Sequence, residues 1–408
     1  MQKIKQIEAR QIIDSRGNPT IETTVILESG LAACASVPSG ASTGSHEAVE
    51  LRDGDNNNFA GKGVLKAISN IKTIIEPNLR GTDVSDQLKI DTLMLQLDGT
   101  ENKSRLGANS ILSVSMAAAR ASAHSLNQPL YKHIKELYKG SVRTKEVSPL
   151  FNVINGGLHA EGSVSFQEFF IIPKGKNFEH SLQMGCEIYQ KLKKQLHFMG
   201  KNTNLGDEGG FAPHFENNDE VLSLLFQVSK KYNVGFGLDV ASNTFFENGN
   251  YSPEKIKLTS GDYIEFISKI CKKHNLEILE DPLAEDAWDD WVKLTSKVGS
   301  NLRIIGDDLL VTNPKRLKKA IATKAGNGIL VKVNQIGTLS ETLEVVKIAQ
   351  NADFTVIISH RSGETTDDFI ADLAVGVGAD YVKFGAPARG ERVAKYNRLL
   401  EIYSQKSL

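Results

Sequence analysis

The stretch that decides the fold is "GILVKVNQIGTLSETLEVVKIAQNADFTVIISH", residues 328–360. It begins and ends with short apolar runs, at residues 328–334 and 354–360, and the segment between them is long enough for a helix. Within that segment Thr338 and Glu341 have the spacing of a capping box, and apolar residues recur with the helical period. A strand, a helix and a second strand in this order predict one unit of a parallel α/β fold.

The same alternation extends in both directions from this unit. We count eight short apolar runs, at residues 149–155, 165–173, 233–240, 275–281, 301–308, 328–334, 354–360 and 380–385. From the third run onward the intervening segments are long enough for crossover helices, and Asn313, Pro314 and Gly326 mark the start and end of one of them. Eight strands with mostly βα alternation predict a TIM-like barrel. The first two runs have no helix between them, so the start of the barrel is irregular.

The residues before the barrel predict a separate α+β domain. Residues 20–29 alternate between faces as a half-buried strand does, and the turn sequence "RGNPT" leads into them, which indicates a β-meander. Helical stretches follow at residues 63–76, ending at Pro77, and at residues 108–126. We therefore expect an N-terminal α+β domain over residues 1–125, a polar linker over residues 126–147 and the barrel domain over residues 148–408.

Composition bounds the class of protein. The chain has 408 residues, of which 40% are hydrophobic, and its formal net charge of -1 argues against a nucleic-acid or anionic membrane partner. Cys34, Cys186 and Cys271 are far apart and lack metal-site spacing, so neither a disulfide framework nor a zinc site is indicated. No apolar run approaches the roughly 20 residues that cross a bilayer. We therefore expect a soluble, cytoplasmic protein.

Six successive predicted strands end in an ionisable residue. These residues are Asp239, Glu280, Asp307, Lys332, His360 and Lys383. In a barrel of this kind the C-terminal ends of the strands meet at one mouth, so the six side chains should converge. The three carboxylates, without a cysteine, form a hard-oxygen set that selects Mg²⁺ or Mn²⁺. A single acid at a strand end could equally cap a helix or form a salt bridge, but three in consecutive strands favour a metal site.

Other residues near the predicted mouth suit acid–base and anion chemistry. Lys332 lies in an apolar run, where a lysine is costly unless it is paired or has a lowered pKa, so it is a general-base candidate. The alternative is a lysine that reaches out to the barrel rim. Arg361 and Ser362 offer a charged fork and a hydroxyl to a phosphate or carboxylate. Glu208 lies in "GDEGG", where the glycines allow close approach to a ligand or form an ordinary turn.

A glycine- and serine-rich loop, "SVPSGASTGSHEAVELRDGD" at residues 36–55, lacks the spacing of a phosphate-binding P-loop. Next to the barrel, its glycines indicate hinges of a lid that closes over the mouth. A divalent metal, a lysine base and a separate acid are the groups needed to abstract a weakly acidic proton beside a carboxylate.

These motifs resemble the enolase family, the phosphopyruvate hydratases, nearly from end to end. The matching stretches include "DSRGNPT", "GANSILSVSMAAA", "GDEGGFAP", "VKVNQIGTLSET" and "SHRSGETTD". The resemblance implies Mg²⁺-dependent, reversible dehydration of 2-phospho-D-glycerate to phosphoenolpyruvate in glycolysis, with two Mg²⁺ ions per active site and a homodimer or octamer. It also implies two adjacent antiparallel strands at the start of the barrel, which would account for the missing helix.

The resemblance assigns roles by motif position. Lys332 would take the C2 proton, and Glu208, assisted by Glu168, would protonate the departing 3-hydroxyl. The other positions are Asp239, Glu280 and Asp307 for the first Mg²⁺, Ser39 for the second, Arg361 and Ser362 for the phosphate, Lys383 for the carboxylate side, and Gln167, His159 and His360 for the pocket lining. His159 also counts among the catalytic residues.

Two alternatives stay open at this point. The chain could be another dehydratase or racemase of the same superfamily, or a non-enzymatic scaffold derived from an enolase. Phe384 stands where family members commonly carry threonine, and Gly390 where many carry serine. The phenylalanine adds bulk and removes a hydroxyl beside Lys383, which raises the question of how that lysine is placed.

Overall fold

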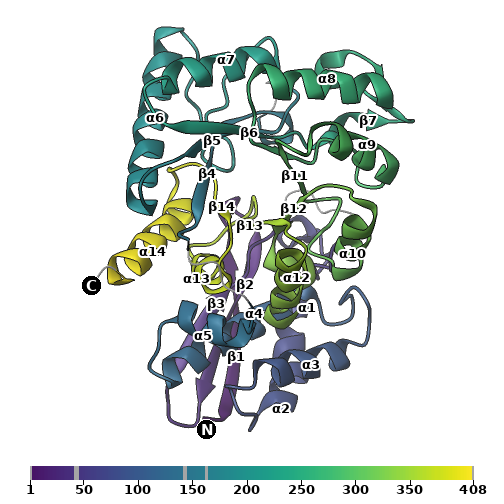
Figure 1. The fold of residues 1–408 in the computed structure, drawn as a ribbon. Helices are drawn as coiled ribbons and strands as arrows, with labels where there is room; N and C mark the ends of the chain where they lie inside the picture. The colour runs from purple at the N-terminus through teal and green to yellow at the C-terminus, as the bar shows by residue number, and fades with distance from the viewer. Residues whose placement is uncertain (1, 41–45, 141–144, 161–163, 407–408) are drawn as a thin grey trace.

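The computed structural model describes residues 2–40, 46–140, 145–160 and 164–406. A small three-stranded sheet with its helices forms the N-terminal part, and a closed eight-stranded barrel forms the rest (Figure 1). The predicted fold class, a TIM-like barrel preceded by an α+β domain, is confirmed. None of the described helices combines the length and the apolar composition needed to cross a bilayer.

The N-terminal sheet is an antiparallel meander. Its strands are β1 (Ile4–Ile13), β2 (Pro19–Leu27) and β3 (Ala32–Ser36). Ile21, Thr23 and Val25 are fully buried, whereas Glu22 and Thr24 between them are partly exposed, so the predicted alternation is confirmed. The long helix α4 (Ala108–Ser125) packs on this sheet, and Thr23 and Ser113 share a buried hydrogen bond of 2.7 Å between their hydroxyl oxygens.

One predicted helix end is wrong. The helix predicted to end at Pro77 begins as α1 (Leu65–Asn70). It continues through a π-helical turn (Ile71–Ile75) into α2 (Glu76–Leu79), past Pro77. In the wide turn the N–H of Glu76 donates to the carbonyl of Ile71, five residues back. We attribute the continuation to this wider turn, because it changes the hydrogen-bond ladder next to a residue that has no N–H to donate.

The segment expected to link the domains is partly helical. After α3 (Gln87–Asp98) and α4, the helix α5 (Leu130–Tyr138) forms inside residues 126–147. The Tyr131 N–H donates to Asp372 at 3.0 Å, so α5 is tied to a helix of the barrel. The segment was expected to be a linker because its charges are dense, but its apolar residues Leu130 and Ile134 recur at helical spacing and are buried.

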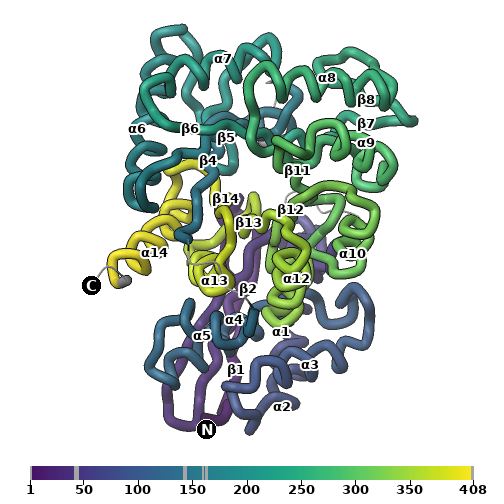
Figure 2. Tube along the Cα trace, in the orientation of Figure 1, coloured from purple at the N-terminus to yellow at the C-terminus, as the bar shows by residue number. Residues whose placement is uncertain are grey.

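The barrel closes with the last strand beside the first (Figures 1 and 2). Its strands are β4 (Ser148–Asn155), β5 (Glu168–Pro173), β6 (Val234–Asp239), β10 (Ile278–Glu280), β11 (Arg303–Gly306), β12 (Gly328–Val331), β13 (Thr355–Ser359) and β14 (Tyr381–Lys383). Each falls within a predicted run or overlaps it closely. β5 is antiparallel to both β4 and β6, and the other neighbours are parallel, so the irregular start is confirmed.

Helices surround the barrel, and a smaller apolar cluster fills its interior. The helices are α6 (Phe178–Phe198), α7 (Asn218–Ser229), α8 (Ser260–Lys273), α9 (Trp288–Val298), α10 (Pro314–Thr323), α11 (Val333–Ile336), α12 (Leu339–Asn351), α13 (Phe369–Val377) and α14 (Gly390–Lys406). A short sheet of β7 (Phe246–Glu247), β8 (Asn250–Tyr251) and β9 (Leu258–Thr259) lies outside the barrel order. Asn313 and Thr338 cap α10 and α12 as predicted. However, α10 ends at Thr323, because the next residue, Lys324, has a left-handed φ of 61° that stops the helix before Gly326.

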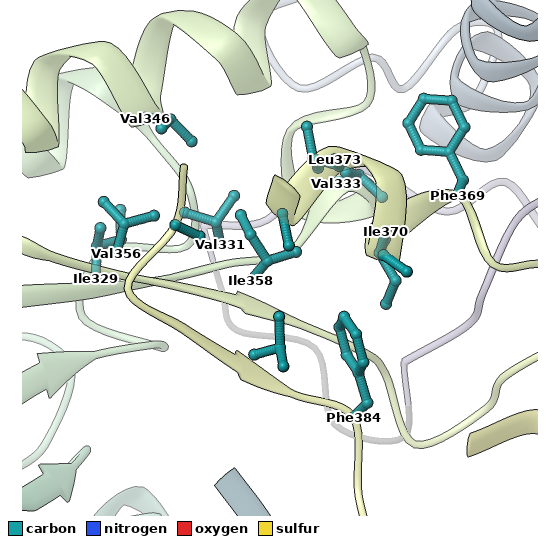
Figure 3. Close-up of a cluster of buried hydrophobic side chains, with 14 of the residues drawn as sticks. Ile329, Val331, Val333, Val346, Val356, Ile358, Phe369, Ile370, Leu373 and Phe384 are labelled. Atoms are coloured by element: carbon teal, nitrogen blue, oxygen red, sulfur yellow. The ribbon is translucent and has the colours of Figure 1, made fainter. Parts of the chain in front are cut away.

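Phe384 belongs to the outer core and not to the barrel mouth. Its side chain is fully buried, its ring centroid lies 5.8 Å from that of Tyr396 on α14, and it sits near Ile370 of α13 (Figure 3). Lys383, one residue earlier, points to the opposite side of the strand, as alternation requires. A Cβ on Gly390 would meet nothing within 4 Å, so the backbone there has room for a serine.

Candidate active site

A cavity of about 480 Å³ opens at the mouth of the barrel. The lining includes ten of the residues singled out in the sequence: Gln167, Glu168, Glu208, Asp239, Asp307, Lys332, His360, Arg361, Ser362 and Lys383. Glu168, Asp239 and Lys383 lie on β5, β6 and β14, and the other seven lie in connections between elements. The side chain of His159 lies outside the described part of the structure, as do residues 41–45 of the expected lid.

Lys383 is the centre of a buried acidic group. Its Nζ lies 2.9 Å from both carboxylate oxygens of Glu280, 3.0 Å from Glu168 Oε2 and 3.3 Å from Asp239 Oδ2. The strand register explains this proximity, because Glu168 pairs with Asp239 and Asp239 pairs with Glu280 across neighbouring strands. Burial raises the pKa of Glu168 and of Glu280 well above the ordinary value. The acids around Lys383 outweigh its own burial and raise its pKa well above normal.

Asp307 and Lys332 form a second buried ion pair through Oδ2 and Nζ. Gln335 Nε2 donates to the other oxygen of Asp307 at 2.9 Å. Burial alone would raise the pKa of Asp307, but Lys332 and Arg361 lower it, and the net shift is downward. For Lys332, burial would lower the pKa, but Asp307 raises it above normal. Lys332 is therefore paired and protonated in this arrangement, rather than neutral as its apolar surroundings alone would suggest.

Sequence reasoning missed two acids beside this pair. Carboxylate oxygens of Asp281, Asp307 and Asp308 lie within 4.8 Å of one another. Asp281 accepts the backbone N–H groups of Asp307 at 2.9 Å and Asp308 at 2.8 Å. Burial raises the pKa of Asp308 to about 7, and the neighbouring Asp307 adds to the rise. The sequence does contain a signal for these two acids, because each directly follows an acid at a predicted strand end, as "ED" at 280–281 and "DD" at 307–308.

This donor set fits a divalent cation. Most of the acids that line the cavity are buried, all of them supply only oxygen, and they outnumber the cationic side chains of the lining, which are Lys332, Arg361 and Lys383. Hard oxygen ligands of this kind suit Mg²⁺. Ser39, like Glu280, is not among the residues that line the cavity. Its hydroxyl donates to Asp14, and its backbone pairs with Gly363 at 2.7 and 3.0 Å.

Glu208 is held on the other side of the acidic group. Its Oε2 lies 3.2 Å from His360 Nε2 and accepts a hydrogen bond of 3.1 Å from Asn152 Nδ2. Burial lowers the pKa of His360 to about 3, so the imidazole is neutral at physiological pH. Glu208 and Glu168 interact electrostatically, and this repulsion is the second cause, after burial, of the raised pKa of Glu168.

Arg361 pairs with an acid from the N-terminal part of the chain. Its Nη1 lies 2.9 Å from Glu47 Oε2 and 3.2 Å from Asn334 Oδ1, and its side chain is buried. Glu47 also lines the cavity. The sequence predicted that the loop of residues 36–55 lies at the mouth, but it did not single out Glu47, because the pairing joins residues 314 positions apart. The N-terminal part therefore contributes a charged side chain to the mouth.

Comparison with known families covers both parts of the chain. Residues 4–134 match the family model described as the enolase N-terminal domain. Residues 146–407 match the one described as the enolase C-terminal TIM barrel domain. A closed barrel with buried acids at its mouth and an α+β domain that reaches the same cavity agree with both matches. On this basis, the chain belongs to the enolase family.

Proposed function

We propose that the protein catalyses the reversible, Mg²⁺-dependent dehydration of 2-phospho-D-glycerate to phosphoenolpyruvate. The observation that carries the proposal is that one cavity is lined by Lys332, the Glu168 and Glu208 carboxyls, Arg361 and an excess of buried acids. A lysine base combined with magnesium is the general pattern of enolase-superfamily sites.

Asp239, Glu280 and Asp307 would hold the first Mg²⁺. When bound, the ion would neutralise the substrate carboxylate and the negative charge that develops when the neighbouring carbon loses a proton. Ser39 would have to leave Asp14 before it could serve as a ligand of a second ion.

Lys332 would accept the proton from C2. Its pKa is raised by Asp307, so the lysine becomes a base only when the charge of Asp307 is engaged elsewhere. Arg361 and Lys383 already lower the pKa of Lys332, and with Asp307 engaged Glu280 would be left to oppose them. The same acid that would hold the cation thus controls the protonation of the base.

Glu208 and Glu168 would supply the proton for the departing 3-hydroxyl. Burial, and then repulsion from Glu208, raise the pKa of Glu168 well above the ordinary value, so this pair of carboxyls holds a proton more readily than an exposed glutamate does. Arg361 and Ser362 would bind the phosphate, with Glu47 giving way to it, and Lys383 would face the substrate carboxylate. His159 and Gln167 would complete the pocket.

The decisive experiment follows the absorbance of the enol product from 2-phosphoglycerate, with and without Mg²⁺. Wild-type protein should form product only with the metal. Lys332→Ala should lose at least about 100-fold in turnover, because a general base is removed, while it keeps Mg²⁺ binding. Lys318→Ala, which alters an exposed lysine on α10, should behave as wild type.

Two results would reject the proposal in different ways. If the wild type forms no metal-dependent product, the assigned reaction is wrong, and unphosphorylated hydroxy acids become the substrates to try. If Lys332→Ala turns over normally, the reaction stands but this lysine is not its base. From family likeness alone, we also propose a cytoplasmic homodimer or octamer.

A further inference from the structure

Arg392 reaches the pocket wall from behind. It lies in the first turn of α14, and its side chain is completely buried. Its Nη1 lies 2.7 Å from His360 Nδ1 and donates to the Arg361 carbonyl at 2.5 Å. Its Nη2 donates to the carbonyls of Ser362 at 2.6 Å and Asp207 at 3.2 Å. One guanidinium therefore joins the strand end that carries His360 to the loop that carries Glu208.

The chemistry of the guanidinium decides the state of the imidazole. Arginine has only donors and keeps its charge, so the His360 nitrogen that faces it must present a lone pair. With the ring turned over, a carbon would face Nη1 and one N–H of a buried cation would lose its acceptor, at a free-energy cost. The neutral ring then carries its one proton on Nε2, which lies 3.2 Å from Glu208 Oε2.

The groups around the ring oppose the charged form. Glu208 favours a protonated imidazole, whereas burial, Arg392 and Lys383 disfavour it, and together they lower the pKa of His360 to about 3. The backbone at Gly385 passes close to the ring, because a Cβ added there would lie 3.0 Å from His360 Cε1. Gly385 has a φ of +84°, so the backbone itself favours glycine at this contact.

We propose that Arg392 is a positioning residue, which fixes His360 as the neutral tautomer with its proton on Nε2 and thereby determines which oxygen of Glu208 carries the transferable proton. The Nε2 proton of His360 and the amide of Asn152 both face Oε2 of Glu208. An oxygen that accepts the Asn152 amide and also lies 3.2 Å from His360 Nε2 is disfavoured as the site of a proton, so the acid proton resides on Oε1. That atom lies 3.5 Å from the hydroxyl of Ser362, a residue proposed to bind substrate. The step assigned to Glu208 rests on the proposed function, but the tautomer does not.

The wild-type protein itself gives the first test. In protein labelled with ¹⁵N at its nine histidines, long-range ¹H–¹⁵N correlation spectra distinguish a protonated from an unprotonated ring nitrogen. His360→Gln identifies the signals of His360 by their loss. We expect an unprotonated Nδ1 and a protonated Nε2 that do not change between about pH 6 and about pH 8, where an ordinary histidine titrates. A protonated Nδ1 in the wild type, or a ring that titrates in this range, would overturn the proposal without any variant of Arg392.

The second test separates positioning from loop anchoring. Arg392→Lys keeps a buried cation but cannot reach the ring and three carbonyls together, so we expect mixed tautomers and a kcat lower by up to about 100-fold with little change in KM. The matched control is Arg389→Lys, because Arg389 also donates to the loop before Glu208, at the Gly206 carbonyl (3.1 Å), without touching His360. The control should keep the wild-type tautomer and kcat.

The outcomes are distinguishable. A wild-type tautomer together with a normal kcat in folded Arg392→Lys, or an equal loss of kcat in Arg389→Lys, would refute the role of Arg392. If the spectra agree with the prediction but 2-phosphoglycerate is not turned over by the wild type, the positioning of His360 holds and the proposed reaction fails instead.

Discussion

Asp281 lines the cavity, but both of its carboxylate oxygens are bound by the backbone. Its carboxylate accepts two consecutive backbone N–H groups, so it fixes the turn that presents Asp307 and Asp308. It does so with a φ of 39°, in a region that few residues other than glycine, asparagine and aspartate adopt. Because the two hydrogen bonds hold the backbone of the acid proposed to bind Mg²⁺, we infer that Asp281 aims that ligand.

Asp281→Asn should weaken Mg²⁺ binding about 10-fold, because an amide has one acceptor oxygen and cannot hold both backbone N–H groups. Calorimetric titration of the protein with Mg²⁺ measures this directly, and the Mg²⁺ dependence of turnover provides a second reading. Asp289→Asn, an exposed acid at the start of α9, is the control and should bind as wild type does. Equal affinities for all three proteins would show that Asp281 does not position the ligand.

At the scale of elements, two adjacent residues at the end of β14 point into different environments. Lys383 enters the acidic cluster, and Phe384 packs outward against Tyr396 of α14. Alternation along the strand separates the two side chains, so the bulk of the phenylalanine is taken up by the outer core. The same helix α14 carries Arg392, which means that packing at Phe384 supports the wall of the pocket from outside.

Phe384→Thr should therefore lower stability and leave substrate affinity unchanged. Removal of a buried aromatic ring costs about 3–5 kcal/mol of unfolding free energy, which urea denaturation would measure. Phe384→Leu should cost less because it leaves a smaller cavity. If the threonine variant had a changed KM and unchanged stability, Phe384 would act on the substrate site and not on the outer core.

The elements were predictable because their signals are local. Each barrel strand is a short apolar run, and most strands toward the mouth end in an ionisable residue, so their convergence followed from the fold. Glu47, Arg392 and Asn152 were not predictable in the same way. Each reaches the site through a contact between segments far apart in the chain, and no period or motif within a single segment encodes such a contact.

At the scale of the whole molecule, the two parts are joined by buried polar contacts. Arg120 on α4 forms ion pairs with Asp367 at 2.6 Å and Asp368 at 2.7 Å, just before α13. Asp91 on α3 accepts from the Ser340 N–H at 2.9 Å and from the Ser340 hydroxyl at 2.6 Å, at the start of α12. Since Glu47 completes the mouth from the N-terminal part, these contacts also maintain the pocket.

Asp91 should make this junction sensitive to pH. Burial raises its pKa from 3.8 to about 6. Between these values the native protein retains a proton that the unfolded chain has lost, so the contribution of Asp91 to the unfolding free energy falls as pH rises from about 4 to about 6. Above that window the contribution is constant.

Denaturant unfolding of the wild type and Asp91→Asn across this pH range would test the prediction. Relative to Asp91→Asn, the unfolding free energy of the wild type should fall by about 3 kcal/mol from the lower to the higher pH, which is the equivalent of roughly two pKa units. Asp289→Asn again provides the exposed control, with little change in the difference. A pH-independent difference for Asp91→Asn would mean that this carboxyl has an ordinary pKa in the native state.

The reversed direction of β5 has a consequence for the design of variants. Because β5 opposes β4, the connection between Asn155 and Glu168 both leaves and re-enters the barrel at the mouth, whereas a regular βα connection crosses to the far rim before the chain returns. The connection is bounded at one end by Glu168, a residue of the acidic cluster. Near that end Phe166 is fully buried and its N–H donates to Asn218 Oδ1 at 3.2 Å, so an exchange of the connection that keeps Phe166 would alter the rim of the cavity while the strand register stays in place.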